Sequence, residues 1–533
     1  MKFQQQLASR SKQEIWDSFC GFLEYSMDEY MQVQTRLMEE QIDYWSNSEV
    51  GQAILKGQFP KSIDEFRKMV PLTTYEDYAD LLLPKQSASL PMHPVVWIET
   101  TWEGGRHPVK VAPYSRSMLD TYKKNMICCL ILSSSQQKGE FDVSVDDKLL
   151  YGLAPLPYAT GLFPLLLNEE IDMKFLPDPV EAQNMSFSER NKLGFKMAMR
   201  SDVEFFFGMG SVLYAVTQNI MQASTKSGGV SSILKYPLKR IIQIIKAKKV
   251  SRAENRQVIP KDLFNLKGFM VAGTDNHFYK DDLEQMWGVR PMEIFAGTEP
   301  ALIGTETWTR DGMYFFPDSS FYEFIKEDDY LQLLDNPEYV PNTYLMNEVV
   351  TGEKYEIVLT VMKGGSFARY RVGDVYQCVG LRNSEDGTRI PRFRYVDRVL
   401  NIVDIAGFTR ISEYSISKAI EHSKVNVVDW IARKEVSDTN RPFLKLYVEI
   451  DQSYLTNNPL STDILKELLT TYFKYIDQDY KDLKKILGMD PLEIDLLPVD
   501  TFKKYRECYS KPIRKLNASH HDVMNLLNSA DRR

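Results

Sequence analysis

The chain has 533 residues, more than one compact core usually holds, so we expect two or three domains. Hydrophobic residues make up 43% of the sequence and aromatic residues 12%, which is enough for a large buried interior. The formal net charge of −8 gives no global argument for binding nucleic acid or an acidic membrane surface.

The first part of the chain predicts helices and then alternating elements. Residues 12–57 carry aromatic and apolar side chains at three- and four-residue steps, which is typical of helices. Thr73–Glu76 has the capping character of a helix start. From about residue 95 to residue 300, short β-rich runs alternate with helical stretches, which favours α/β layers around a largely parallel sheet.

The second part changes character twice. Residues 302–400 read as strands and turns, as expected for a β-rich subdomain. After a boundary near Arg398, the pattern predicts a helix over 412–423, a strand over 442–450 and a helix over 463–480. We therefore expect a domain over residues 1–398 and a smaller one over 399–533.

Several features favour a cytoplasmic protein without an integral membrane segment. The N-terminus has no apolar signal core. Residues 151–167 are uncharged, but their three prolines argue against a spanning helix. The five cysteines show no metal-binding spacing, and we expect reduced thiols.

Two short motifs predict a nucleotide site. The stretch 352–374 reads as a strand, a KGG turn and a second strand that ends in Gly373-Asp374. A carboxylate at a strand end can accept two hydrogen bonds from a vicinal diol such as a ribose. Upstream, a short apolar strand runs into Thr298-Glu299, whose hydroxyl and carboxylate suit a phosphate and its Mg²⁺.

In this combination and order, the motifs resemble the acyl-adenylate-forming superfamily. The resemblance is specific to the acyl acid amido synthetases that conjugate auxin and jasmonate to amino acids, including their bacterial relatives. It rests on residues 66–82, 273–299, 321–325, 348–360, 369–375 and 391–398. It implies an α/β fold with a large N-terminal adenylate-forming domain of mixed and parallel sheets with a β-rich subdomain, plus a small, mobile α+β C-terminal domain.

The resemblance also implies an activity. ATP and Mg²⁺ would activate a small carboxylic acid as an acyl-adenylate, and the acyl group would pass to an amino acid to form an amide. Coenzyme A is the alternative acceptor, because thioester and amide formation share the first half-reaction. A non-catalytic protein that binds a nucleotide or an acyl group is the alternative of another class.

Site residues follow from the resemblance. Thr298 would contact the α-phosphate, Glu299 would hold Mg²⁺, and Asp374 would bind the ribose. A lysine from the C-terminal domain would neutralise charge on the adenylating phosphate, with Lys511 the first choice and Lys515 the second. The remaining nucleotide contacts would come from Gly273, Thr274, Phe295, Ala296, Gly297 and Arg398.

The predicted phosphate loop departs from the family pattern. Lys110 and the following Pro113-Tyr114 match it, but Trp102 and Glu103 stand where small neutral residues are expected. A glutamate there repels a triphosphate unless it binds the metal or points away. Hydroxyl and glycine content remains at Thr100, Thr101, Gly104 and Gly105. An ordinary glycine turn without phosphate function is the alternative for this loop.

Two further segments leave alternatives open. The predicted acyl pocket has walls near Tyr158, Thr160, Phe207 and Met209, and core strands with glycine turns explain the same residues equally well. The run 235–252 carries seven positive charges, no negative charge and an apolar stripe of isoleucines. It predicts either a membrane-surface or phosphate-binding helix, or a surface helix whose isoleucines enter the core.

Overall fold

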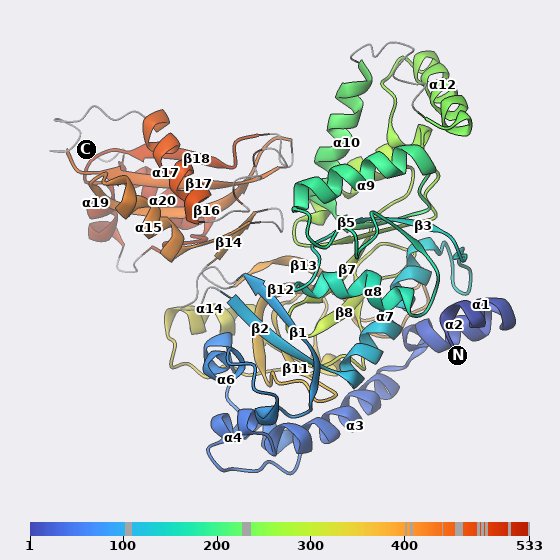
Figure 1. Ribbon diagram of the computed structural model, residues 1–533. Helices are drawn as coiled ribbons and strands as arrows, with labels where there is room; N and C mark the ends of the chain where they lie inside the picture. The colour runs from blue at the N-terminus through green and yellow to red at the C-terminus, as the bar shows by residue number, and fades with distance from the viewer. Residues whose placement is uncertain are drawn as a thin grey trace. The chain divides into compact units, whose positions relative to one another are not determined.

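A computed structural model describes residues 1–101, 109–225, 236–399, 402–405, 409–439, 441–452, 462–476, 480, 484, 489–509 and 513–530. Its internal contacts divide the chain into two compact units. Unit 1 contains Lys280–Asp397 and most of the chain up to Ala272. Unit 2 contains Gly273–Tyr279 and the chain from Arg398 onward. Figure 1 shows their ribbons.

The N-terminal part of unit 1 is helical, as the sequence predicts. Serine N-caps begin four of these helices, because each hydroxyl accepts a hydrogen bond from a free backbone N–H of the first turn. At the helix start predicted over 73–76, the structure has a 3₁₀ turn. The Thr74 backbone N–H donates a hydrogen bond to the Asp77 carboxylate there. The elements are α1 (Phe3–Ser9), α2 (Lys12–Cys20), α3 (Met27–Ser46), α4 (Glu49–Leu55), α5 (Ile63–Met69), η2 (Tyr75–Asp77) and α6 (Ala79–Leu82).

The centre of unit 1 is an eleven-stranded sheet. Five neighbouring strands are parallel, in the order β4, β3, β5, β6, β7. Their bounds are β3 (Lys148–Gly152), β4 (Lys174–Leu176), β5 (Phe205–Met209), β6 (Gly268–Ala272) and β7 (Met292–Gly297). Helices follow these strands in the chain, as the predicted α/β alternation requires. They include α8 (Leu162–Asn168), α9 (Phe187–Ser201), α10 (Gly210–Thr225), α12 (Leu238–Ala253) and α13 (Lys280–Trp287), while α7 (Arg116–Ser134) precedes β3.

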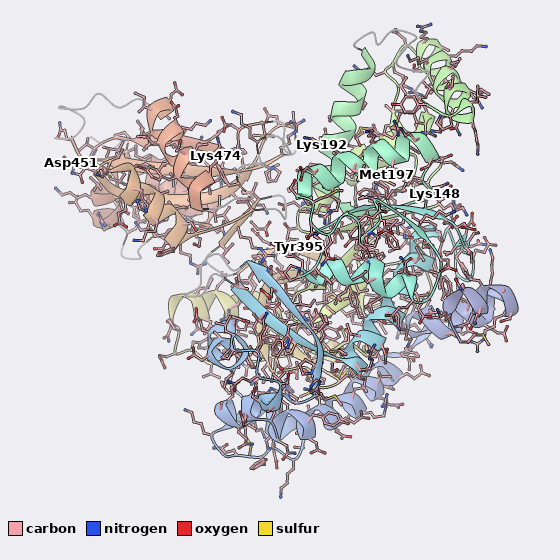
Figure 2. All side chains as sticks on the ribbon, in the orientation of Figure 1. Lys148, Lys192, Met197, Tyr395, Asp451 and Lys474 are labelled. Atoms are coloured by element: carbon pink, nitrogen blue, oxygen red, sulfur yellow. The ribbon has the colours of Figure 1, made fainter. Side chains whose placement is uncertain are left out.

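Antiparallel strands continue the same sheet from β7. They form the expected β-rich segment, and the order continues β8, β9, β13, β12, β11, β10. Their bounds are β8 (Ala301–Glu306), β9 (Met313–Phe315), β10 (Ser320–Lys326), β11 (Lys354–Val361), β12 (Tyr370–Gly380) and β13 (Arg392–Arg398), with α14 (Glu327–Asp335) after β10. Buried aromatic and aliphatic side chains pack around this sheet. Figure 2 shows the side chains of the described residues as sticks on the ribbon.

Two expectations from the sequence are wrong in detail. The run near residue 95 is not part of the parallel sheet, because β1 (Pro94–Thr101) pairs antiparallel with β2 (Val109–Ser115) in a separate two-stranded sheet. The second strand of the 352–374 motif does not end at Asp374 but continues to Gly380. A register shift opposite Ile357 interrupts its pairing with β11, so Asp374 lies at a bulge inside the strand.

Unit 2 has its own core around a three-stranded sheet. In that sheet β17 (Pro442–Ile450) is central, between antiparallel β16 (Val427–Val436) and parallel β18 (Leu492–Leu497). The strand and both helices expected after residue 399 are present, the second helix as far as Ile476, while residues 477–479 of that prediction lie outside the described residues. The remaining elements are β14 (Ile402–Ile405), β15 (Thr409–Ser412), α15 (Glu413–Ser423), α17 (Thr462–Ile476), α19 (Thr501–Cys508) and α20 (His520–Ala530). None of the helices that the structure describes, in either unit, has the length and apolar character needed to cross a bilayer.

Buried amides on α3 hold the turns of the β-rich segment in unit 1. The Gln41 side chain donates to the Gly365 carbonyl at 2.8 Å and accepts from the Gly364 N–H at 2.8 Å. The Gln34 side chain donates to the Pro317 and Ser320 carbonyls at 2.6 and 2.8 Å and accepts from the Tyr322 N–H at 3.2 Å. Gly364 has a φ of 84°, a conformation that favours glycine. Gln41 therefore fixes the KGG turn between β11 and β12, and Gln34 holds the connection between β9 and β10.

We expect Gln41→Met to lower the free energy of unfolding by about 2–4 kcal/mol, because it leaves two buried backbone groups without partners. Urea unfolding measures this change. Gln32→Met, at an exposed position of the same helix, is the matched control and should shift stability by less than about 0.5 kcal/mol. Equal effects of the two substitutions would contradict the anchoring role of Gln41.

Candidate active site

The carboxyl end of β7 presents the predicted Thr298-Glu299 pair. The tight connection to β8 consists of these two residues and Pro300, and Ala301 follows with a φ of 62°. In open α/β sheets, ligands bind outside the carboxyl ends of the parallel strands. Phe295, Ala296 and Gly297 form the last part of β7, as the sequence predicts, with Ala296 exposed and the other two half-buried.

Glu299 is the centre of the site. Only 6% of the residue is exposed, and one carboxylate oxygen, Oε1, meets two side chains from distant parts of unit 1. The Lys110 ammonium from β2 lies 3.1 Å from this oxygen, and the Tyr370 hydroxyl from β12 donates to it at 2.5 Å. Lys110 Nζ and the Tyr370 hydroxyl are themselves 2.9 Å apart. Side chains from β2 and β12 thus meet the carboxylate that the turn after β7 carries.

The charge of Glu299 depends on these contacts. Burial by itself raises the pKa of the carboxyl, but the Lys110 charge and the Tyr370 hydrogen bond hold it below its usual value. Glu299 is therefore a carboxylate at neutral pH. A buried carboxylate beside a lysine can hold a cation and a phosphate at the same place.

Two further tyrosines support Lys110 and the turn after β7. The Tyr114 hydroxyl donates to the Thr298 carbonyl at 2.7 Å, and the Tyr75 hydroxyl donates to the Val111 carbonyl at 3.2 Å. The Lys110 ammonium lies over the Tyr75 ring, 5.5 Å from its centroid. Burial raises the pKa of Tyr75 to about 12 and that of Tyr114 well above its usual range, so both phenols stay neutral. As neutral groups, the two phenols position Lys110 and the Thr298-Glu299 turn without adding a charge to the site.

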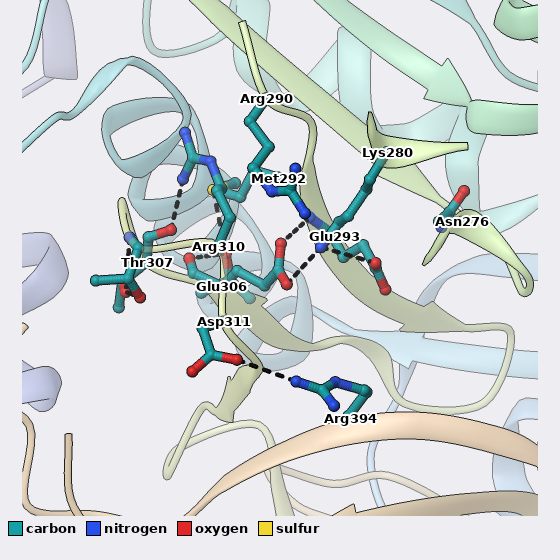
Figure 3. Close-up of polar contacts among 12 residues, drawn as sticks. Asn276, Lys280, Arg290, Met292, Glu293, Glu306, Thr307, Arg310, Asp311 and Arg394 are labelled. Carbon is teal, nitrogen blue, oxygen red and sulfur yellow. Dashed lines mark hydrogen bonds and ion pairs between the residues drawn. The ribbon is translucent and has the colours of Figure 1, made fainter. Parts of the chain in front are cut away.

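A second buried charge cluster lies along β7 and β8 (Figure 3). The Lys280 ammonium is 2.8 Å from a Glu293 carboxylate oxygen and 2.6 Å from one of Glu306. The Glu293 N–H also donates to Glu306 at 2.8 Å. Arg310, after β8, donates to the carbonyls of Ser133 and Thr307 at 2.9 and 2.6 Å. This cluster attaches β7 and β8 to the start of α13 and the end of α7.

Asp374 lies on the strand that also carries Tyr370. It is 4% exposed, and the residue before it, Gly373, has a φ of 83° that the bulge requires. Next to it, Glu356 is bound by both arms of Arg371, at 2.8 and 2.7 Å. Burial raises the pKa of Glu356, and the nearby Asp374 carboxylate raises it further, against the effect of Arg371. The bulge, rather than the predicted strand end, sets the position of the Asp374 carboxylate.

The remaining predicted nucleotide contacts belong to unit 2. Gly273 has a φ of 107°, and the Thr274 hydroxyl donates to the Asp404 carboxylate at 2.7 Å. Burial raises the pKa of Asp404, but the charges of Arg410, Arg398 and Lys434 and the Thr274 hydrogen bond hold it below its usual range. The roles of Gly273, Thr274 and Arg398 toward a nucleotide stay predictions.

The predicted acyl-pocket residues come from two segments, a 3₁₀ turn and β5. Phe207 is 3% exposed, and its ring packs against Phe163 at 4.5 Å, so it belongs to the core. Thr160 donates to the Ala154 carbonyl at 2.8 Å within a 3₁₀ turn, and Tyr158 precedes that turn. Met209 ends β5 and is half-buried. For Phe207 the structure supports the alternative that the sequence left open, a core strand.

Part of the predicted phosphate loop lies outside the described residues. Thr100 is described on β1, where it pairs with Lys110 across the hairpin. Thr101 is described in its backbone alone, and Trp102, Glu103, Gly104 and Gly105 are outside the description. Of the two candidate lysines, Lys511 is also outside it. Lys515 is half-buried, forms an ion pair with Asp429 and lies over the Trp430 ring, 5.2 Å from its centroid.

The donor set fits a nucleotide-bound Mg²⁺ better than an independent metal site. Within the described part of the chain, no group of three or more His, Cys, Asp or Glu side chains could hold a metal ion. Mg²⁺ is commonly bound through one or two carboxylates together with substrate phosphates. Glu299 can supply one such carboxylate.

Sequence reasoning named Lys110, Thr298 and Glu299 but missed three tyrosines: Tyr75, Tyr114 and Tyr370. Tyr75 and Tyr370 stand inside segments that carried the resemblance, and Tyr114 belongs to the Pro113-Tyr114 pair that matches the family pattern after the phosphate loop, but none of the three was given a role. Buried phenols beside a charged pair were not recognisable because their partners are distant in the chain; Tyr370 and Glu299 are separated by 71 positions.

Comparisons with solved structures define the class of fold. An acyl acid amido synthetase in complex with 2,4-DB (AtGH3.15) matches 97% of this chain and 96% of its own, with a TM-score of 0.53 at 16% identity. A 2-hydroxyisobutyryl-CoA ligase in complex with 2-HIB-AMP and CoA matches 91% of this chain and 88% of its own, with a TM-score of 0.53 at 14% identity. The fold is therefore the one expected, that of the acyl-adenylate-forming enzymes.

Sequence comparison identifies which group of acyl-adenylate-forming enzymes the chain resembles. Residues 313–398 match the GH3 family central domain. A probable indole-3-acetic acid-amido synthetase, GH3.11 of Oryza sativa subsp. japonica, is 26% identical over 197 residues, 35% of this chain. The match spans about a third of the length of that relative, 32%. The resemblance to the acyl acid amido synthetases is confirmed, and the central segment from β9 to β13 carries it.

We expect Lys280→Met to lower the free energy of unfolding by about 3–5 kcal/mol at neutral pH, because two buried carboxylates lose their shared cation. Burial and Glu293 raise the pKa of Glu306 despite Lys280. A carboxyl with a raised folded pKa contributes stability at low pH and loses it as the pH rises. Removing Lys280 raises this pKa further, so the deficit should shrink as the pH falls toward about 5.

Denaturant unfolding at several pH values measures the Lys280→Met deficit. Lys354→Met, which removes a half-exposed ion pair with Glu327, is the control and should cost less than about 1 kcal/mol. A deficit for Lys280→Met that stays constant or grows on acidification would show that the carboxylates do not depend on this cation.

Proposed function

We propose that this protein is a ligase that uses ATP to activate a small carboxylic acid as an acyl-adenylate and then transfers the acyl group to an amino acid, forming an amide. The observation that carries the proposal is the buried Glu299 carboxylate at the carboxyl end of β7, held by Lys110 and Tyr370. The GH3 central-domain match and the adenylate-forming fold support the same reaction class.

In the first half-reaction, the substrate carboxylate attacks the α-phosphorus of ATP and pyrophosphate leaves. Positioning and charge stabilisation supply most of the catalysis in phosphoryl-transfer chemistry. Glu299 would hold Mg²⁺, which neutralises phosphate charge when it is bound. Lys110, on the adjacent hairpin strand, would donate to phosphate oxygens, and Thr298 would contact the α-phosphate. Asp374 would accept hydrogen bonds from the ribose hydroxyls.

The second half-reaction needs an acceptor. The GH3 central-domain match favours an amino acid, since the rice relative is a probable amido synthetase. Coenzyme A is the second candidate, since the fold is shared with a coenzyme A ligase at the same TM-score. A non-catalytic protein is less favoured, because a pure binding protein has no need of a carboxylate that holds Mg²⁺.

The division into an N-terminal domain over 1–398 and a mobile C-terminal domain over 399–533 is part of the proposal. In this class a C-terminal lysine would complete the adenylating site. The ion pair of Lys515 with Asp429 commits that side chain within unit 2, which supports Lys511 as the first choice. The cytoplasm is the proposed location.

Pyrophosphate release from the purified protein with Mg-ATP, across a panel of carboxylic acids, tests the proposed reaction. Hydroxylamine added to trap the acyl-adenylate distinguishes adenylation from ATP hydrolysis. We expect release that depends on the acid, and a fall of at least about a hundredfold in Glu299→Gln, because the variant loses the metal carboxylate. The exposed Glu353→Gln is the matched control and should keep the wild-type rate.

Two outcomes would contradict the proposal. Absence of acid-dependent release across a broad panel, together with no ATP binding, would favour the non-catalytic alternative. Full activity of Glu299→Gln would remove the proposed role of that carboxylate. Once an acid is found, amino acids and coenzyme A can be compared as acceptors.

For the ribose contact, we expect Asp374→Ala to weaken ATP binding about tenfold to a hundredfold, because charged hydrogen bonds of this kind are each worth about 1.5–3 kcal/mol. Isothermal titration calorimetry measures the affinity, and circular dichroism shows whether the variant is folded. Asp374→Asn keeps the shape of the side chain and should bind with intermediate affinity. If a folded Asp374→Ala bound ATP as tightly as the wild type, Asp374 would have no role at the ribose.

A further inference from the structure

Helix α12 is attached to the rest of unit 1 along one narrow face. Its inward residues recur at steps of four, three and four: Arg240, Ile244, Ala247 and Ser251, each at most 8% exposed. The Arg240 guanidinium donates to the Leu263 and Met199 carbonyls at 2.7 and 3.1 Å. This anchors α12 to η5 (Pro260–Asp262) and α9, at the periphery of unit 1 (Figure 1).

The opposite face of α12 is apolar and open to solvent. Leu238, Ile242 and Ile245 are 79%, 65% and 56% exposed. At about 100° per residue they lie on one line, half a turn away from the inward face. The expectation that the isoleucines of this run enter the core therefore holds for Ile244, whereas Ile242 and Ile245 form an outward ridge.

Cations border the ridge on every side. Lys239 and Lys246 lie along one flank, Lys248 and Arg252 along the other, and Lys249 continues the line of the ridge itself. From Lys235 to Arg252 the sequence contains no acidic residue. The protein as a whole carries a net charge of −8, so this concentration of positive charge is local.

We propose that the outer face of α12 docks on the surface of an anionic phospholipid bilayer. An aliphatic ridge flanked by lysines and arginines matches a membrane interface, where apolar side chains enter the acyl boundary and cations meet the headgroup phosphates. The long lysine side chains reach the headgroups while their methylene stems cover the ridge. The helix lies in the plane of the surface and does not cross it.

The charge pattern argues against two other occupants. In a symmetric contact between two copies the same patch faces itself, so these lysines would oppose one another. Nucleic acid would attract the cations but would leave three exposed aliphatic side chains without a match at the middle of the face. An anionic bilayer matches both the aliphatic ridge, through its acyl chains, and the flanking cations, through its headgroup phosphates.

Co-sedimentation of the full-length protein with vesicles tests the proposal. The vesicles are phosphatidylcholine alone, or phosphatidylcholine with about one-third phosphatidylglycerol. We expect binding to the anionic vesicles alone, weakened by salt. Leu238→Ser/Ile242→Ser/Ile245→Ser, or Lys239→Gln/Lys246→Gln/Lys249→Gln, should lower the partition coefficient by roughly tenfold or more.

Matched controls separate this face from general charge or apolar exposure. Lys56→Gln/Lys61→Gln/Lys68→Gln removes the same charge from exposed positions elsewhere, and Val340→Ser removes an aliphatic side chain that is 84% exposed. Both should bind like the wild type. Because all of these positions are exposed, the variants should keep the wild-type melting temperature.

Three results would overturn the proposal: no binding of the wild type to anionic vesicles, equal binding to phosphatidylcholine alone, or unchanged binding of both α12 variants. If sedimentation velocity instead showed a concentration-dependent dimer that the ridge variant abolishes, without vesicle binding, the face would belong to a second copy. Pyrophosphate release in solution measures the proposed ligase activity separately, so failure of the two proposals can be told apart.

Discussion

The ion pair between Glu299 and Lys110 is the constraint on which the site depends. A buried carboxylate is costly unless a cation and hydrogen bonds compensate it, and here Lys110 and Tyr370 do so at 3.1 and 2.5 Å. These residues come from a hairpin, from the turn after β7 and from β12. The eleven-stranded sheet must therefore form across its parallel and antiparallel parts, and the separate β1–β2 sheet must pack beside it, before the three groups can meet.

Buried polar side chains also hold the strands around the site in place. Lys280 holds two carboxylates of β7 and β8 together, and the amide of Gln41 holds the turn that leads into β12. Each of these side-chain contacts joins segments that are separated in the sequence. Displacement of β7 or β12 would separate Glu299 from its partners, so the packing of the sheet and the charge of the site are coupled.

The sequence predicts much of this architecture. The α/β alternation, the β-rich middle segment and the elements after residue 399 follow from periodicity and turn residues. Glu299 follows from a short motif, and Lys110 follows from the resemblance to the acyl acid amido synthetases. Local patterns could not predict the bulge at Asp374, because it arises from the register between β11 and β12. They could not predict the role of Tyr370 or decide between a pocket wall and a core strand for Phe207 either, because both depend on partners that only the folded chain brings near. Exposure of Ile242 and Ile245 likewise depends on which face of α12 Arg240 anchors.

A crystal structure with Mg²⁺ and a non-hydrolysable ATP analogue tests the central claim most directly, because it shows what Glu299 and Lys110 bind. The account predicts a Glu299 carboxylate oxygen about 2.0–2.1 Å from Mg²⁺ and the Lys110 ammonium within hydrogen-bond distance of a phosphate oxygen. A nucleotide bound away from the carboxyl end of β7, with Glu299 still held by Lys110 and Tyr370, would contradict it.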